Sequence, residues 1–258
     1  MTAAHDLAEY SAIFGAGAAA GVMNTVVGSG TLLTFPTLLA FGYTPVLANV
    51  SNTIGLVPGS VSGAYGYRAE LGGQRRRVLT LGACSLLGGV LGALLLLHLP
   101  ASAFQDVVPV LIGLALVLVI VQPKVGGWAA RRREERGTAQ REAGGPLLWA
   151  GVFATGVYGG YFGAAQGVLL LALMGIAFTD SLQRINAVKN ILAGLVNGVA
   201  AVLFICLSQV SWTAAGLIAA GSILGGQIGA HLGRRLSPAV LRAVIVCVGI
   251  AAIVKLLA

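Results

Sequence analysis

The chain has 258 residues, of which 57% are hydrophobic and 9% are charged, and its formal net charge is +8. Soluble domains carry about 25% charged residues, so this composition excludes an ordinary soluble protein and predicts a polytopic membrane protein. The basic residues gather in short loops without interleaved aromatic side chains, which argues against a nucleic-acid partner. The 38 glycines fit closely packed membrane helices.

The beginning of the chain is polar but carries no positive charge. Residues 1–10 contain Asp6 and Glu9 and no lysine or arginine, so we expect no cleaved signal peptide. A spanning helix needs about 20 mostly apolar residues. Apolar runs then follow one another along the chain, at 10–27, 31–42, 46–66, 78–99, 104–122, 146–162, 167–178, 185–207, 212–232 and 238–257.

Two of these runs are too short to cross a bilayer, and both follow a break that contains glycine. Run 31–42 follows Gly28-Ser29-Gly30, and run 167–178 follows the segment Gly-Ala-Ala-Gln-Gly at 163–167. The arrangement recurs in both halves of the chain, which are separated by the basic segment 123–145. Residues 85–93, SLLGGVLGA, also resemble residues 222–230, SILGGQIGA, at a spacing of 137 residues. We therefore predict an all-α membrane protein with one repeat over 1–122, a cytoplasmic loop over 123–145 and a second repeat over 146–258.

The basic residues predict that the two repeats are inverted. Loop 67–77 is rich in arginine and the next connection, 99–103, has none, whereas connection 208–211 has none and the next one carries Arg234 and Arg235. Because cytoplasmic loops are enriched in lysine and arginine, equivalent loops of the two repeats are expected on opposite sides of the membrane.

The same rule predicts how each repeat begins. Units 10–42 and 146–178 must each cross an even number of times, either as two thin helices or as a re-entrant hairpin, and three spanning helices follow each unit. Both termini are then outside. All but two of the 16 lysines and arginines lie on the cytoplasmic side, and the exceptions are Lys189 and Lys255.

The matched breaks predict a binding site at the centre of the membrane. Interrupted helices in corresponding positions of inverted repeats are typical of secondary transporters, because unpaired backbone groups survive in lipid only where they line a cavity. Helix starts at Thr31 and Val168 favour an anion. The candidate donors are Gly28, Ser29, Gly30 and Thr31 from one break and Gln166 and Gly167 from the other. The alternative is that these glycines only permit tight packing.

Lys189 is the only lysine or arginine placed well within a predicted span. Such a buried charge is costly and usually functional, although Lys189 would have no such role if it reached the nearby cytoplasmic interface. Its neighbours Asn186 and Asn190 match an uncharged cluster in the first repeat, which consists of Asn49, Ser51 and Asn52. Asn24 precedes the first break and is a further candidate donor. Tyr161 is expected either to line the pathway or to pack at the membrane interface.

No motif for catalysis or metal binding is present. The chain has no HExxH, GxSxG or P-loop sequence, and its three cysteines lie in apolar runs without ligand spacing. We expect no enzyme activity, no cofactor and no metal site. The matched pairs Gly88-x-x-x-Gly92 and Gly225-x-x-x-Gly229 are expected to serve helix packing.

The breaks and their flanking sequences resemble a known family. GAGAAAGVMNTVVGSGTLLTFPTLLAFGYTPVLANVSNTIGL and GVYGGYFGAAQGVLLLALMGIAFTDSLQRINAVKNILAGLVNG are similar to the two repeats of the TauE/SafE, or sulfite exporter, family. The resemblance implies a multi-pass transporter of sulfite, sulfoacetate or other organosulfonates. It carries over the two tips, 28–31 and 166–167, and the helices that follow, 49–52 and 186–190. The second tip is not a close copy of Gly-Ser-Gly, which leaves its donors open.

Together these features predict a secondary transporter of small sulfur-containing anions that works by alternating access in the cell (inner) membrane. A small-anion channel of the same architecture is the alternative, and a membrane scaffold without transport is a third. The expected partners are the anion and the lipid bilayer. A homodimer is compatible with the sequence, but nothing in the sequence requires one.

Overall fold

The computed structural model describes residues 2–135, 142–232 and 238–257, and within these ranges the chain is helical and contains no strand. This confirms the predicted all-α class. One 3-10 helix, Arg68–Leu71, accompanies the α-helices, which are α1 (Thr2–Val26), α2 (Thr31–Ala40), α3 (Pro45–Gly66), α4 (Arg75–His98), α5 (Ala101–Glu135), α6 (Pro146–Tyr161), α7 (Gln166–Ala177), α8 (Leu182–Leu207), α9 (Trp212–Leu232) and α10 (Pro238–Leu257).

Four helices in the described ranges are long and apolar enough to cross a membrane. They are Arg75–His98, Ala101–Lys124, Leu182–Leu207 and Trp212–His231. Helices α2 and α7 have 10 and 12 residues and therefore span only about 15 and 18 Å, half of a bilayer core. Helix α3 has 22 residues, but the buried polar residues Asn49, Ser51 and Asn52 interrupt its apolar character. The protein is therefore a multi-pass membrane protein with short broken segments.

Helix α5 is longer than its apolar run. It contains 35 residues and ends at Glu135, beyond the run expected at 104–122. Its last seven residues, AARRREE, are strong helix formers, which explains why the helix continues into the basic segment.

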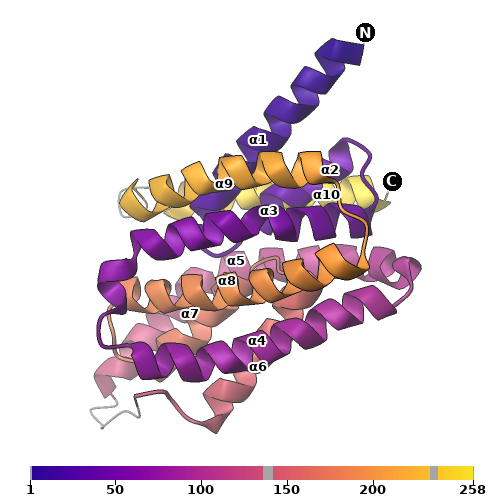
Figure 1. The fold of residues 1–258 in the computed structure, drawn as a ribbon. Helices are drawn as coiled ribbons and strands as arrows, with labels where there is room; N and C mark the ends of the chain where they lie inside the picture. The colour runs from indigo at the N-terminus through magenta and orange to yellow at the C-terminus, as the bar shows by residue number, and fades with distance from the viewer. Residues whose placement is uncertain (1, 136–141, 233–237, 258) are drawn as a thin grey trace.

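The helices form two layers, which we call the first and the second layer (Figure 1). In the first layer α1 and α3 both pack along α9, and α10 packs on α2; in the second layer α4 packs along α6 and α8, and α5 packs on α7. The layers meet mainly where α3 contacts α8 and α5 contacts α10. Each layer thus combines helices from both predicted repeats. The inversion of the repeats and the sides of the termini stay predictions.

Backbone contact between helices holds each layer together. A Cβ atom added at Gly225 would overlap the carbonyl oxygen of Ala18 in α1, and one added at Gly92 would overlap the carbonyl oxygen of Val157 in α6. The glycines of both predicted packing motifs therefore lie where α9 meets α1 and where α4 meets α6.

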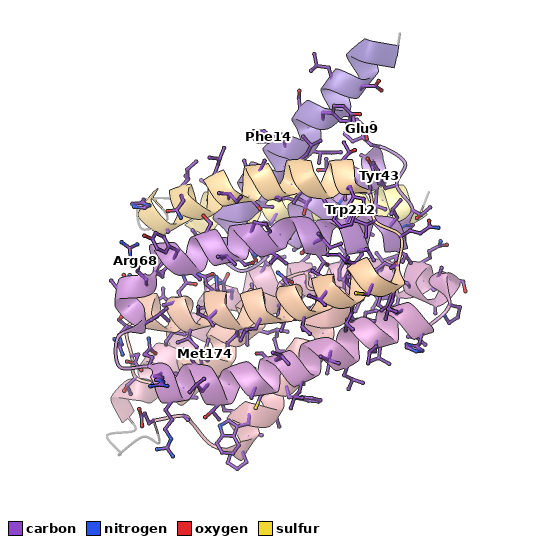
Figure 2. The ribbon with its side chains drawn as sticks, viewed as in Figure 1. Glu9, Phe14, Tyr43, Arg68, Met174 and Trp212 are labelled. Carbon is purple, nitrogen blue, oxygen red and sulfur yellow. The ribbon has the colours of Figure 1, made fainter. Side chains whose placement is uncertain are left out.

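The first pair of helices, α1 and α2, turns back on itself. Tyr43, which follows α2, donates a hydrogen bond from its hydroxyl to Glu9 Oε1 in α1 at 2.9 Å, and both residues lie at the same end of the molecule (Figure 2). The second pair, α6 and α7, does the same. Arg77 Nη1 contacts Asp180, just after α7, at 2.7 Å, while its Nε donates to the carbonyl of Glu142, just before α6. We call the two pairs the first and the second hairpin.

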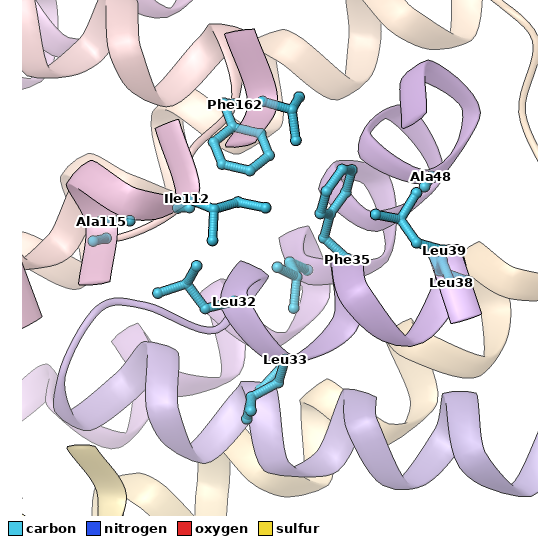
Figure 3. Close-up of a cluster of buried hydrophobic side chains, with 14 of the residues drawn as sticks. Leu32, Leu33, Phe35, Leu38, Leu39, Ala48, Ile112, Ala115 and Phe162 are labelled. Carbon is cyan, nitrogen blue, oxygen red and sulfur yellow. The ribbon is translucent and has the colours of Figure 1, made fainter. Parts of the chain in front are cut away.

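An apolar cluster fixes the first hairpin against the end of the second. Phe35 of α2 meets Phe162 edge-on, with ring centroids 5.2 Å apart, and Leu32 and Ile112 surround them (Figure 3). Because Phe162 directly follows α6, this cluster determines how the turn of one hairpin faces the turn of the other.

Candidate functional site

The turns of the two hairpins touch through their main chains. The amide of Gly167 donates to the carbonyl of Gly28 at 3.0 Å. Gly28 has a φ of +90°, and a Cβ on either glycine would overlap the backbone of the other. Glycine is therefore required at both positions, and the two breaks do meet as the predicted site needs.

The first turn leaves consecutive backbone donors without acceptors. In α2 the amides of Leu32 and Leu33 bond to the carbonyls of Ser29 and Gly30. The amides of Ser29, Gly30 and Thr31 have no acceptor within the described ranges. Ser29 is also buried, and its hydroxyl has no partner. Successive free amides at a helix start form an anion-binding arrangement.

The second turn differs because the amides of Gln166, Gly167 and Val168, which match Ser29, Gly30 and Thr31 at the repeat spacing of 137 residues, are already bonded. Helix α7 begins at Gln166, two residues before the expected Val168, since Ala165 adopts a left-handed φ of 62° and ends the turn. The amides of Gln166 and Val168 bond within the turn, and that of Gly167 bonds to Gly28. What this turn offers instead is the side chain of Gln166, which is buried against Gly159 and whose Nε2 has no partner.

Lys189 belongs to α8 and is fully buried against the end of α1. Its Nζ donates to the carbonyl of Asn24 at 2.7 Å and to that of Thr25 at 3.1 Å, and Asn186 Nδ2 also donates to Thr25 O at 3.0 Å. These carbonyls belong to the last turn of α1, which carries a partial negative charge. Lys189 therefore does not reach the interface. An ammonium has three donors, so one remains for a ligand.

Asn49 makes the corresponding contact at the end of α6. Its Nδ2 donates to the carbonyl of Tyr161 at 3.0 Å. The repeat spacing of 137 residues pairs Asn49 with Asn186 and Asn52 with Lys189. The long helix after each hairpin thus bonds to the first helix of the other hairpin. Sequence reasoning matched the two clusters without this pairing, although the spacing already implied it.

The remaining predicted residues divide into those at the turns and one that lies elsewhere. Asn52 Nδ2 donates to Thr31 Oγ1 at 3.3 Å, and its Oδ1 accepts from Thr34. Asn24 Nδ2 donates to Ser60 Oγ at 3.3 Å. The ring of Tyr161 packs on Phe104, so its backbone rather than its hydroxyl faces Asn49. Ser51 instead accepts from the amide of Ser211, before α9, and is not part of the cluster.

Unpaired polar atoms concentrate at this site. Seven buried side-chain atoms in the described ranges have no hydrogen-bond partner, and five of them belong to predicted site residues: Ser29 Oγ, Asn49 Oδ1, Gln166 Nε2, Asn186 Oδ1 and Asn190 Nδ2. Each such atom costs about 1–3 kcal/mol when nothing binds it. A ligand at the turns would explain why they gather there.

The electrostatic balance at the turns is positive. Among the described residues, the buried charged side chains are Lys189 and Arg77, and no carboxylate is buried. Arg77 is paired with Asp180, whereas Lys189 contacts only neutral carbonyls. The site therefore suits a small anion.

A second polar cluster, missed by sequence reasoning, lies at the base of the second hairpin. Asp180 contacts Arg77 at 2.7 Å and Arg184 at 2.9 Å, and the guanidinium of Arg77 lies 3.7 Å from the centre of the Phe178 ring. Burial raises the pKa of the Asp180 carboxyl, but hydrogen bonds from Arg184 and Arg77 outweigh it and hold this pKa below its usual value. The spacing of Asp180 and Arg184, one helical turn, was the available signal.

Comparison with known proteins covers nearly the whole chain. The family described as "Sulfite exporter TauE/SafE" matches residues 13–256. The "Probable membrane transporter protein YfcA" of Escherichia coli (strain K12) is 28% identical over 251 residues, covering 92% of this chain and 86% of that protein. A "Probable membrane transporter protein" of Haemophilus influenzae is 24% identical over 223 residues, or 85% of this chain and 83% of the relative. No solved structure gives a significant match.

Proposed function

The chain belongs to the sulfite exporter TauE/SafE family of membrane transporters, and from this we propose that it is a secondary transporter of small sulfur-containing anions such as sulfite, sulfoacetate or other organosulfonates. The anion rests at the two hairpin turns, and alternating access carries it across the cell (inner) membrane.

Two features carry this proposal: the free amides of Ser29, Gly30 and Thr31, and the buried Lys189, whose side chain lies against Gly167 where the two turns touch. A sulfite or sulfonate group presents three oxygens, each able to accept hydrogen bonds, to a row of three donors. Hydrogen bonds to a charged group contribute about 1.5–3 kcal/mol each, net of the hydrogen bonds to water that they replace. The third proton of Lys189 and the Ser29 hydroxyl complete the set.

The two layers supply the moving parts. Lys189 and Asn186 belong to the second layer and hold the end of α1 in the first, while Asn49 belongs to the first layer and holds the end of α6 in the second. Any rocking of one layer against the other changes these contacts. The anion site therefore lies where movement between the layers would open it to one side at a time.

Ligand-dependent thermal stability of the purified protein tests the proposal. A ligand that binds only the folded state raises the apparent melting temperature. We expect one sulfur anion from a panel of sulfite, sulfate, sulfoacetate, taurine, formate and chloride to stabilise the wild type and to leave Lys189→Ala unchanged. If no anion shifts either protein, the anion site is refuted.

Flux into proteoliposomes then separates a transporter from a channel of the same architecture. A transporter is expected to saturate and to show faster uptake when the vesicles are preloaded with unlabelled anion. Flux that rises in proportion to concentration, without exchange, would favour the channel.

A further inference from the structure

The end of α6 lacks the cation that the end of α1 possesses. At α1 the last carbonyls receive the ammonium of Lys189. At the repeat spacing Asn52 takes the position that matches Lys189. The side-chain amide of Asn52 donates a hydrogen bond to Thr31 and accepts one from Thr34. Of the described carbonyls at the end of α6, that of Tyr161 receives only the neutral amide of Asn49.

Two further side-chain oxygen atoms lie near this end of α6. Asn49 is 1% exposed, and because its Nδ2 bonds to Tyr161 O, its unpaired Oδ1 lies close to that carbonyl. Thr31 Oγ1 lies 4.0 Å from the Cβ position of Gly163, in the turn that follows α6. The carbonyl end of α6 also carries a partial negative charge.

We propose that the carbonyl end of α6, together with Asn49 Oδ1 and Thr31 Oγ1, binds a monovalent alkali cation of sodium size, which is the coupling ion of the transport cycle. This rests on the proposed function. In broken-helix transporters, carbonyl ends of half-helices coordinate such ions while helix starts hold the anionic substrate. The ligands here are neutral oxygens, whereas calcium and magnesium sites are built with carboxylates. The bound ion would offset the partial negative charge at the end of α6, as the ammonium of Lys189 does at the end of α1.

The cation is tested in the absence of any transported anion. The melting temperature is measured at equal ionic strength in sodium, potassium and choline chloride. We expect sodium to raise it above choline by on the order of 3 °C in the wild type. This measurement involves no sulfur anion. Absence of a sodium effect therefore does not contradict binding of the anion, and absence of an anion effect does not contradict binding of sodium.

Three variants place the effect at the end of α6. Thr31→Val removes one oxygen and should lose the sodium shift. Asn52→Lys puts an ammonium at the position related to Lys189, so the melting temperature of this variant should no longer respond to sodium. Ser51→Ala, on the same helix but bonded to Ser211, should respond as the wild type does.

Identical melting temperatures in the three chlorides would overturn the proposal. So would a sodium shift that persists unchanged in both Thr31→Val and Asn52→Lys, because the ion would then bind elsewhere. If Asn52→Lys fails to fold, Thr31→Val alone decides.

Discussion

The carbonyl of Gly28 accepts a hydrogen bond from the amide of Gly167 at 3.0 Å, and their Cα atoms leave no room for a side chain between them. At Gly28 and Gly167 the two hairpins are therefore joined main chain to main chain. This contact occupies the amide of Gly167, whereas the amides of Ser29, Gly30 and Thr31 in the first turn have no acceptor within the described ranges. The two halves of the site are for this reason unequal, although the sequence around them repeats.

Replacing Gly28 by alanine should separate the turns. The new methyl group overlaps Gly167, and the φ of +90° adds strain of about 1 kcal/mol or more for a residue with a Cβ. We expect a lower melting temperature and loss of transport. Gly198→Ala in α8 is the matched control, because no atom lies within 4 Å of its Cβ position. Normal transport by Gly28→Ala would show that the contact between the turns is dispensable.

Lys189→Met should separate the structural role of the ammonium from its role in binding. Both Lys189→Met and Asn186→Ala remove a donor from a carbonyl of α1. Both variants should therefore have a lower melting temperature than the wild type and lose roughly 1–3 kcal/mol of stability. Only Lys189→Met also removes the buried charge. The stabilisation by the sulfur anion should therefore vanish in Lys189→Met and persist in Asn186→Ala. If both variants lost the stabilisation by the sulfur anion equally, Lys189 would act only as a helix cap.

Asp180 should make stability depend on pH in the acid range. Its folded pKa lies below its unfolded value of about 3.9, so its contribution is complete above the unfolded pKa and is lost as pH falls through the folded pKa. Asp180→Asn is expected to cost about 2 kcal/mol near neutral pH, because Arg77 is left buried without its partner, and the difference from wild type should shrink on acidification.

Glu142→Gln is the control for that measurement. Glu142 pairs with Arg76 at 3.6 Å, and both side chains are more than half exposed. Such a surface pair contributes between about 0 and 1 kcal/mol. If Glu142→Gln lost as much stability as Asp180→Asn, the ion pair of Asp180 would contribute no more than an exposed surface pair.

Spin labels can determine whether layers or repeats move. Tyr65 and His231 come from different repeats but lie in the first layer, whereas Tyr65 and Leu79 come from one repeat and lie in different layers; all three are exposed. If the layers rock, the distance between labels at 65 and 79 changes on addition of the stabilising anion and that between 65 and 231 does not. Electron–electron double resonance measures both, and the opposite pattern would assign the motion to the repeats.

Much of the helix pattern could be predicted from the sequence, because long apolar runs and glycine breaks are local signals. The short runs at 31–42 and 167–178 became α2 and α7. Ser51 was grouped with Asn49 and Asn52 because of proximity in sequence, yet residues along a helix face different neighbours, and Ser51 faces Ser211. The mixing of the two repeats within each layer could not be predicted, since hydrophobic periodicity shows which face is buried but not which helix covers it.

The composition of the first layer determines when it can be completed during synthesis. Helices α1 and α3 emerge from the ribosome early, but α9, along which both of them pack, begins only at Trp212. Until then the glycine faces of α1 and α3 have no partner, and the first hairpin enters the bilayer before the helix that will support it exists. The first helices of the chain therefore reach their final packing only when the last helices have been synthesised.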